Sequence, residues 1–154
     1  MRVKLLPYTT KAQLDIDDAV EMIFAPIGSA QGPYPPGKIQ VNGTTWPDGC
    51  TFTGDVTLTW AHRNKYTQDL RQVVHQDAAS VEAGPEGTYT IEVLIAGMVV
   101  PARTVQGVTD ASFVYTLAHC IADGGAGQWI QFRITPILGE TSGSPRTTDQ
   151  FKMV

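Results

Sequence analysis

The residues best suited to catalysis in this chain are an adjacent histidine and cysteine and two further histidines. His119 and Cys120 are neighbours in sequence, and on a helix such neighbours point about 100° apart, so we expect that they do not face each other. No surrounding motif is typical of a cysteine hydrolase. The spacings of 13 and 44 residues between His62, His75 and His119 match no zinc template. We therefore predict neither a catalytic nor a metal site at these residues.

An acidic cluster lies near the start of the chain, at Asp15, Asp17, Asp18 and Glu21. It lacks the loop glycine and the later bidentate glutamate of an EF-hand, so we interpret it as a solvated turn or a helix N-terminus. The sequence contains no nucleophile elbow, no P-loop and no paired catalytic carboxylates. We predict that the chain is not an enzyme and requires no cofactor.

A polar stretch after a predicted strand is the best candidate for partner contact. His62, Arg63, Asn64 and Tyr66 directly follow the strand that ends at Trp60. Loops that leave a rigid scaffold often carry binding residues. The alternative is that Arg63 and Tyr66 pack along the strand end and anchor the long loop that follows. The sequence leaves both interpretations open.

Composition indicates a folded domain that binds no nucleic acid. The chain has 154 residues, 42% of them hydrophobic, and a formal net charge of −4. Phosphate binding needs a clustered excess of basic residues, which is absent. No apolar stretch approaches the roughly 20 residues that span a bilayer, and the first residues lack the apolar region of a secretory signal. We expect no membrane insertion, and we expect Cys50 and Cys120 to be free and buried.

Apolar and polar residues alternate along several segments. From Tyr89 to Ile95, for example, the odd-numbered residues are apolar and Thr90 and Glu92 lie between them. Such alternation is typical of antiparallel strands with one buried face, and two sheets must cover each other. About seven strands of this length make a sandwich, so we predict an all-β antiparallel sandwich. The candidate strands are Lys38–Val41, Thr44–Trp46, Gly54–Trp60, Gly87–Ile95, Val99–Val105, Ser112–Leu117, Trp129–Ile137 and Gln150–Met153.

Two connections depart from this regular pattern. Leu117–Asp123 is the one convincing helical piece, and we expect it to cross the end of the sandwich. Ala61–Glu86 joins two strands through 26 residues, longer than most structureless loops. Leu70–Val74 is a candidate for an extra edge strand within it. Asn42–Gly43 favours a tight turn.

A proline-rich stretch, Pro33–Gly37, separates an N-terminal segment from the sandwich. We therefore divide the chain into residues 1–32, which could belong to an adjoining domain, and a sandwich over residues 36–154. Lys11–Phe24 fits a helix or two short strands, Gln13–Ile16 and Glu21–Phe24. If a neighbouring domain has been lost, an uncovered apolar patch is expected around Leu5, Leu6, Ile23 and Phe24.

The stretch from Pro36 to Val154 resembles a fibronectin type III domain. The resemblance is carried by the segments PPGKIQV, LTW, YTIEVLI and FRITPILGETSGSP. More narrowly, LTWAHRN, EGTYTIEV, ARTVQGV, SFVYTLA and IADGG are similar to a module of tail-tip and central-fibre proteins of siphophages and prophages. This resemblance implies a non-catalytic virion module that contacts other tail proteins or neighbouring domains, with a homotrimer as its assembly.

A second hypothesis is a carbohydrate-binding or adhesin-like sandwich on a secreted or surface protein. Such a module needs an exposed aromatic platform. We expect Trp60 to be in the core, which leaves Trp46 and Trp129 as the platform candidates. The fold alone does not choose between the two hypotheses.

Overall fold

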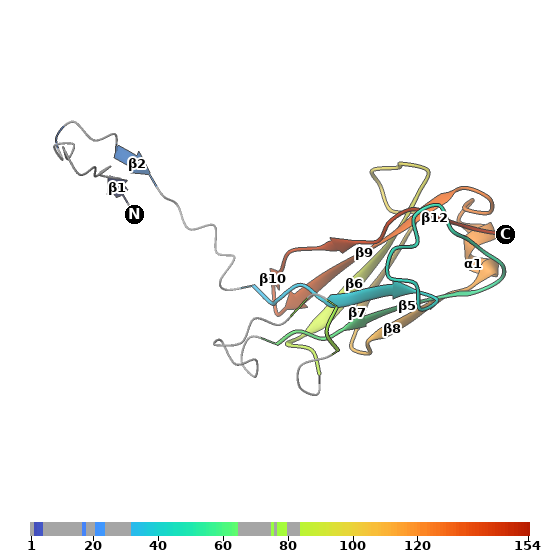
Figure 1. The fold of residues 1–154 in the computed structure, drawn as a ribbon, viewed down its shortest axis with the longest axis horizontal. Helices are drawn as coiled ribbons and strands as arrows, with labels where there is room; N and C mark the ends of the chain where they lie inside the picture. Colours follow the sequence, from blue (N-terminus) through green and yellow to red (C-terminus); the bar gives the residue numbers. More distant parts are fainter. Residues whose placement is uncertain are drawn as a thin grey trace.

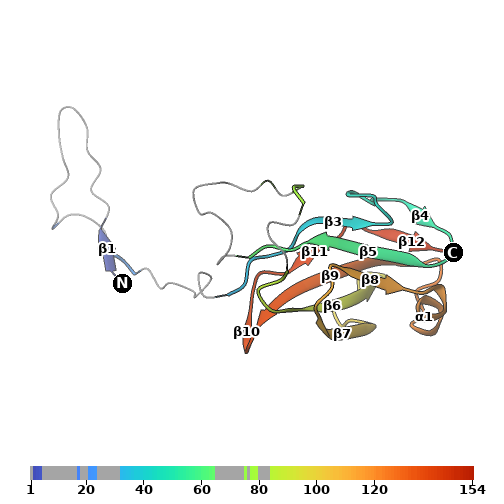
Figure 2. The ribbon, with the colours of Figure 1, turned by 90° about the horizontal axis from the view of Figure 1, so that it is seen from below.

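The computed structural model describes residues 2–4, 17, 21–23, 32–64, 75, 77–79 and 84–154. Within these residues the chain is an all-β sandwich with one short helix, as the alternation predicts, and Figures 1 and 2 show its two sheets facing each other. The smaller sheet is antiparallel and has the order β3 (Gly37–Val41), β5 (Val56–Ala61) and β8 (Ser112–Tyr115).

The larger sheet has seven strands, built around a long central pair. That pair is β6 (Thr88–Ile95) and β9 (Trp129–Leu138), antiparallel from Thr88 opposite Ile137 to Ile95 opposite Ile130. The remaining strands are β7 (Arg103–Val108) beside β6, and β10 (Thr141–Ser142), β11 (Arg146–Thr147) and β12 (Phe151–Met153) beside β9, with β4 (Thr51–Phe52) parallel to β12.

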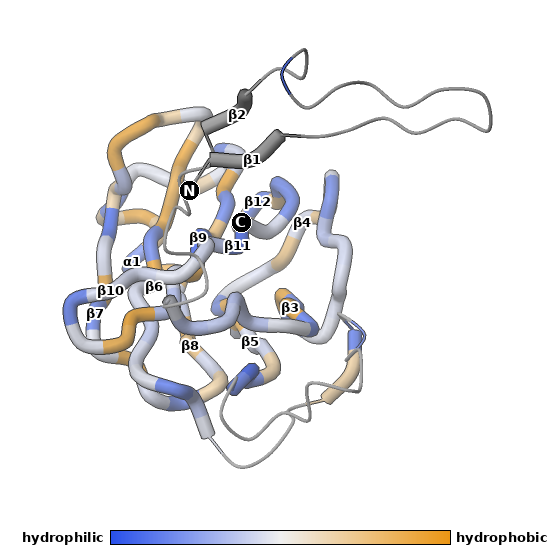
Figure 3. Tube along the Cα trace, turned by 90° about the vertical axis from the view of Figure 1, so that its left-hand side faces the viewer, coloured by the Kyte–Doolittle hydropathy of each residue, from blue (hydrophilic) through white to orange (hydrophobic). Residues whose placement is uncertain are grey.

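The core lies between the two sheets, where the apolar residues of each alternating strand meet. Orange and blue interleave along the strands in Figure 3, which reflects this alternation. In β6 and β9 every second side chain is buried, and Trp60 of β5 is 5% exposed, as predicted. Burying such side chains contributes roughly 1.5–3 kcal/mol each to folding. The sandwich therefore provides a rigid scaffold for its loops.

Two of the predicted strands are wrong in detail. Val99–Val105 is not one strand, because Ala96 (φ 50°) and Gly97 (φ 74°) form a tight turn and pairing with β6 resumes only at Ala102. Thr44–Trp46 is not a strand either. Only Thr44 bridges to Val41 across the Asn42–Gly43 turn.

Cys50 is half-buried, not buried as expected, because it lies in the turn before β4. Cys120 is fully buried, and both cysteines are free.

The N-terminal residues form a separate pair of short strands. β1 (Arg2–Lys4) and β2 (Glu21–Ile23) are antiparallel, with Arg2 opposite Ile23. The sequence allowed either a helix or two short strands over Lys11–Phe24, and the strand that begins at Glu21 is confirmed. It pairs with β1, which the sequence did not predict. Gln13–Ile16, the candidate strand Leu70–Val74, and the side chains of Leu5, Leu6, Ile23 and Phe24 lie outside what the structure describes, as do Asp15 and Asp18.

The predicted helix is confirmed as α1 (Leu117–Ala122), which connects β8 in the smaller sheet to β9 in the larger one. Thr116 caps it, since its hydroxyl accepts a hydrogen bond from the His119 amide at 3.1 Å. Asp55 Oδ1 accepts from the Leu117 amide at 2.8 Å. No helix among the described residues is long and apolar enough to cross a membrane.

Asp123, at the end of α1, ties the helix to both sheets. Its carboxylate accepts hydrogen bonds from Arg103 Nε at 2.7 Å and Nη2 at 2.9 Å, and from the Tyr115 hydroxyl at 2.9 Å. Burial alone would raise the pKa of Asp123, but these hydrogen bonds and the charge of Arg103 outweigh burial and lower it.

Replacing Asp123 with asparagine is expected to lower stability at neutral pH by about 2 kcal/mol, because hydrogen bonds to a charged group are lost. The stabilisation from a lowered pKa is present above the carboxyl's unfolded value of about 4 and disappears as the pH falls through the folded value. Urea unfolding should therefore show a shallower loss of stability between about pH 5 and pH 2 in the variant. Asp48→Asn, at an exposed carboxylate, is the control. Parallel pH curves for wild type and Asp123→Asn would contradict the prediction.

Candidate functional site

Arg63, predicted either to contact a partner or to anchor the long loop, is buried. It is 6% exposed. Its Nη1 donates to the carbonyl oxygens of His62 at 2.9 Å and Ala79 at 3.0 Å, and its Nη2 to those of His75 at 3.2 Å and Ala78 at 2.9 Å. The anchoring interpretation therefore describes what Arg63 does in the structure, and little of its surface remains for a partner.

The guanidinium of Arg63 also lies directly against the first residue of β3. A Cβ added to Gly37 would stand 2.3 Å from Arg63 Nη2. Only glycine leaves room for this approach. Arg63 thus joins the end of β5, the start of β3 and residues 75, 78 and 79 at one end of the sandwich.

His62 belongs to a semi-buried aromatic cluster. Its Nδ1 is 3.1 Å from the Tyr89 hydroxyl and its ring stacks on Tyr89, which makes an edge contact with Trp60. Burial lowers the pKa of His62, with Asp110 acting in the opposite direction, and burial raises the pKa of Tyr89 to about 12. Both side chains are therefore mostly neutral at pH 7.

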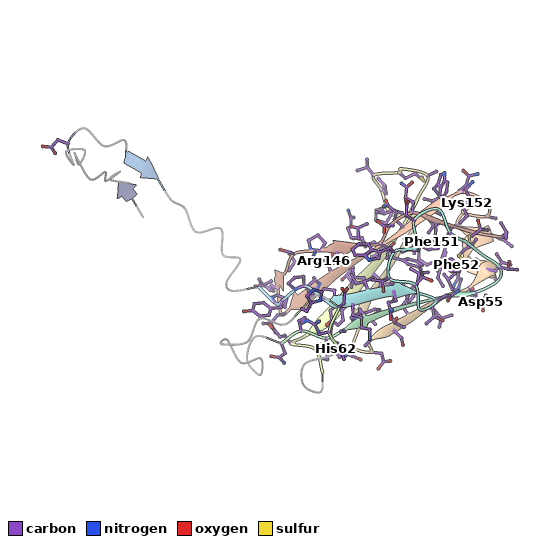
Figure 4. The ribbon with its side chains drawn as sticks, in the orientation of Figure 1. Phe52, Asp55, His62, Arg146, Phe151 and Lys152 are labelled. Carbon is purple, nitrogen blue, oxygen red and sulfur yellow. The ribbon has the colours of Figure 1, made fainter. Side chains whose placement is uncertain are left out.

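The predicted contact stretch contains two further residues, Asn64 and Tyr66. Asn64 is half-buried, and Tyr66 lies outside the described residues. His62 is labelled in Figure 4 at this end of the sandwich.

The histidine–cysteine pair on α1 is not arranged for catalysis. Cys120 is fully buried in the core. Burial raises the pKa of its thiol, and the negative charge of Asp123 raises it further. His119 is exposed and stacks on Tyr115. A thiol with a raised pKa is a poor nucleophile.

The structure supplies no metal site among the residues it describes. No three His, Cys, Asp or Glu side chains there are grouped as metal ligands. His62 contacts Tyr89, His75 lies 3.5 Å from Asp77, and His119 sits on α1. The three histidines thus have different surroundings.

The two platform candidates are both exposed but lie in different places. Trp46 is 73% exposed and Trp129 39% exposed. The Lys152 ammonium lies 4.4 Å from the centre of the Trp129 ring, a cation–π contact on the outer face of the larger sheet. In Figure 4, Lys152 is far along the sandwich from Arg146, which lines the cleft beside Trp46. The two tryptophans therefore do not form one platform.

A cleft of about 100 Å³ lies beside Trp46. It is formed by three segments: β3 and the turn after it, the residues of and after β11, and Asp77. Besides Trp46, the lining includes Ile39, Asp77, Arg146 and Asp149. The cleft combines an exposed indole with both positive and negative side chains.

Exposed apolar side chains occur on the loop from β6 to β7 and on α1. Met98, Val99 and Val100, in the loop from β6 to β7, are 54%, 88% and 71% exposed. Ile121 of α1 is 60% exposed. We call these four residues and Trp129 the apolar end.

Hydrogen bonds hold the parts of the apolar end together. Ala96 N–H donates to the Trp129 carbonyl at 2.7 Å, and Arg103, where β7 begins, binds Asp123 at the end of α1. Alternation of apolar residues did not predict this surface, because Val99 was assigned to a strand. The sequence feature that could have indicated an exposed apolar loop is the uncharged run from Ile95 to Ala102, which contains Gly97.

No protein-family model matches this chain, and no curated protein is significantly similar to it.

Proposed function

We propose that this chain is a non-catalytic structural and interaction module that binds a protein partner through the apolar end. The observation that carries the proposal is the exposure of Met98, Val99 and Val100 on a loop fixed to the sandwich at both ends. Clustered apolar side chains in water are costly, and such surfaces commonly mark protein contacts. Val99, at 88% exposure, is the centre of this loop.

The setting of the module is proposed from the resemblance to tail-tip and central-fibre proteins of phages and prophages. The partners would then be other tail proteins or neighbouring domains, and the assembly a homotrimer within the virion. The supporting segments include LTWAHRN and IADGG, whose residues form the ends of β5 and α1. The buried thiol of Cys120 and the internal use of Arg63 support a structural role over catalysis.

Replacing Val99 with aspartate is expected to reduce incorporation of the protein into tails by at least about tenfold, because a charge enters an apolar contact. The measurement is quantitative immunoblotting of sedimented particles from an induced lysogen that carries the variant gene. Since Val99 is almost fully exposed, the thermal unfolding of the variant should match that of the wild type.

Val114→Asp is the matched control, because Val114 is 51% exposed on β8 in the other sheet. It should be incorporated as the wild type is. The proposal fails if the wild-type protein does not sediment with tail particles, or if Val99→Asp is incorporated normally.

A further inference from the structure

The cleft beside Trp46 has the chemistry of a sugar-binding site. We propose that it binds one hexose unit of a carbohydrate chain, independently of the partner contact at the apolar end. Trp46 is the most exposed of the three tryptophans, at 73%. A flat indole offers a large apolar face at little entropic cost, which suits stacking against the C–H face of a pyranose ring.

Beside the indole, the cleft presents polar groups that are available to a ligand. Within the part of the chain that the structure describes, the side chains of Arg146 and Asp149 make no hydrogen bond or ion pair, and both line the cleft. Arginine supplies only donors and an ionised carboxylate only acceptors. A sugar hydroxyl is both donor and acceptor, so adjacent hydroxyls can bind both groups at once.

The strand side of the cleft is held in place before any ligand arrives. Gln40 Nε2 donates to the Gly43 carbonyl at 3.0 Å and to Thr45 Oγ1 at 3.2 Å, and Val41 and Thr44 exchange backbone hydrogen bonds of 2.9 Å. Trp46 directly follows this turn. The backbone that leads into Trp46 is therefore held by the turn after β3.

The opposite side of the cleft is fixed to β9 through Thr148. The Thr148 hydroxyl accepts a hydrogen bond from the Phe132 amide at 3.0 Å, and the Thr148 amide donates to the Phe132 carbonyl at 2.9 Å. Thr148 is 7% exposed. Two rigid sides lower the entropic cost of binding.

The charges of the cleft select a neutral sugar over an anion. Asp77 and Asp149 line it together with Arg146, so a phosphate or sulfate would meet two carboxylates for one guanidinium. A volume of about 100 Å³ suits contact with a single ring and not with a buried chain. With one stacking ring and few polar groups, the affinity should be weak, with a Kd of about 1 mM.

The test uses the indole N–H signals of the ¹⁵N-labelled full chain, one for each of Trp46, Trp60 and Trp129. The probes are the methyl glycosides of glucose, galactose, mannose and N-acetylglucosamine, titrated separately. At least one of them should shift the Trp46 signal saturably, while the signal of buried Trp60 stays constant.

Arg146→Met should weaken this binding by at least about tenfold, as read from the Trp46 signal. Trp46→Ala removes that signal, so its binding is read from the backbone amide signals of Thr147 and Thr148 in the cleft, and it should fall by at least about tenfold as well. Neither substitution should change the thermal unfolding temperature, because both side chains are exposed. Trp129→Ala, at the other exposed tryptophan, should leave the binding unchanged. The proposal is overturned if none of the four glycosides shifts the Trp46 signal at concentrations up to about 50 mM. It is also overturned if Trp129→Ala, and not Trp46→Ala, abolishes binding. The first of these results leaves the proposal for the apolar end standing, whereas the second would place the sugar on the apolar end itself.

Discussion

Replacing Arg63 with alanine is expected to destabilise the protein by about 3 kcal/mol, the largest effect of any polar substitution considered. The side chain is 6% exposed and satisfies four backbone carbonyl oxygens, those of His62, His75, Ala78 and Ala79. Alanine would leave these carbonyls without their donor and open a void against Gly37. Urea unfolding monitored by tryptophan fluorescence measures the loss.

The control for this prediction is Arg63→Lys, which keeps the charge but not the planar fork. An ammonium has three donors at one point and cannot reach carbonyl oxygens on both arms of the guanidinium. We expect it to recover less than half of the lost stability. Hydrogen exchange should quicken at the amides of His75, Ala78 and Ala79 in both variants, since Arg63 attaches these residues to the end of β5. If Arg63→Ala unfolds at the same urea concentration as the wild type, the anchoring role is wrong.

Replacing Phe132 with alanine is expected to cost about 4 kcal/mol, because it removes the centre of the aromatic core. Phe132 is fully buried on β9. Its ring centroid lies 5.8 Å from that of Tyr115 and 6.3 Å from that of Phe113, both in edge contacts, and 5.3 Å from that of Phe151. These contacts join the two sheets, so the resulting cavity would lie between them.

Phe132→Leu separates lost aromatic contacts from lost volume, because leucine refills most of the space. We expect it to cost about 1.5 kcal/mol. Differential scanning calorimetry of the three proteins should rank their unfolding temperatures as wild type, then leucine, then alanine. An alanine variant as stable as the leucine variant would show that the core collapses around this site and does not keep a cavity.

The two proposed functions use different parts of one scaffold. The apolar end is built from the β6–β7 loop, α1 and Trp129 at the start of β9. The cleft of Trp46 is built from β3 and the turn after it, the segment around β11, and Asp77. Both surfaces lie on loops that connect to core strands at their ends. Val99→Asp should therefore reduce incorporation into tails without changing glycoside binding, and Trp46→Ala should reduce glycoside binding without changing incorporation.

The pattern of apolar residues was sufficient to predict the sandwich and its core. The two-residue period from Tyr89 to Ile95 has only one arrangement that buries the apolar face, and β6 adopts it. The helix after β8 was also predicted, and the glycines Gly124 and Gly125 beyond Asp123 are its local end signal. Such features depend on residues close in sequence, which is why the sequence reveals them.

The surfaces were decided by tertiary structure. Whether Arg63 contacts a partner or anchors a loop depended on carbonyl groups up to 16 residues away, and local pattern carries no information about them. The cleft beside Trp46 exists only because β3, Asp77 and Arg146 meet at one edge of the sandwich. The sequence by itself determined which residues fill the core, since burial follows a short-range period. Only the folded chain determined which exposed residues stand together, since that depends on contacts between distant segments.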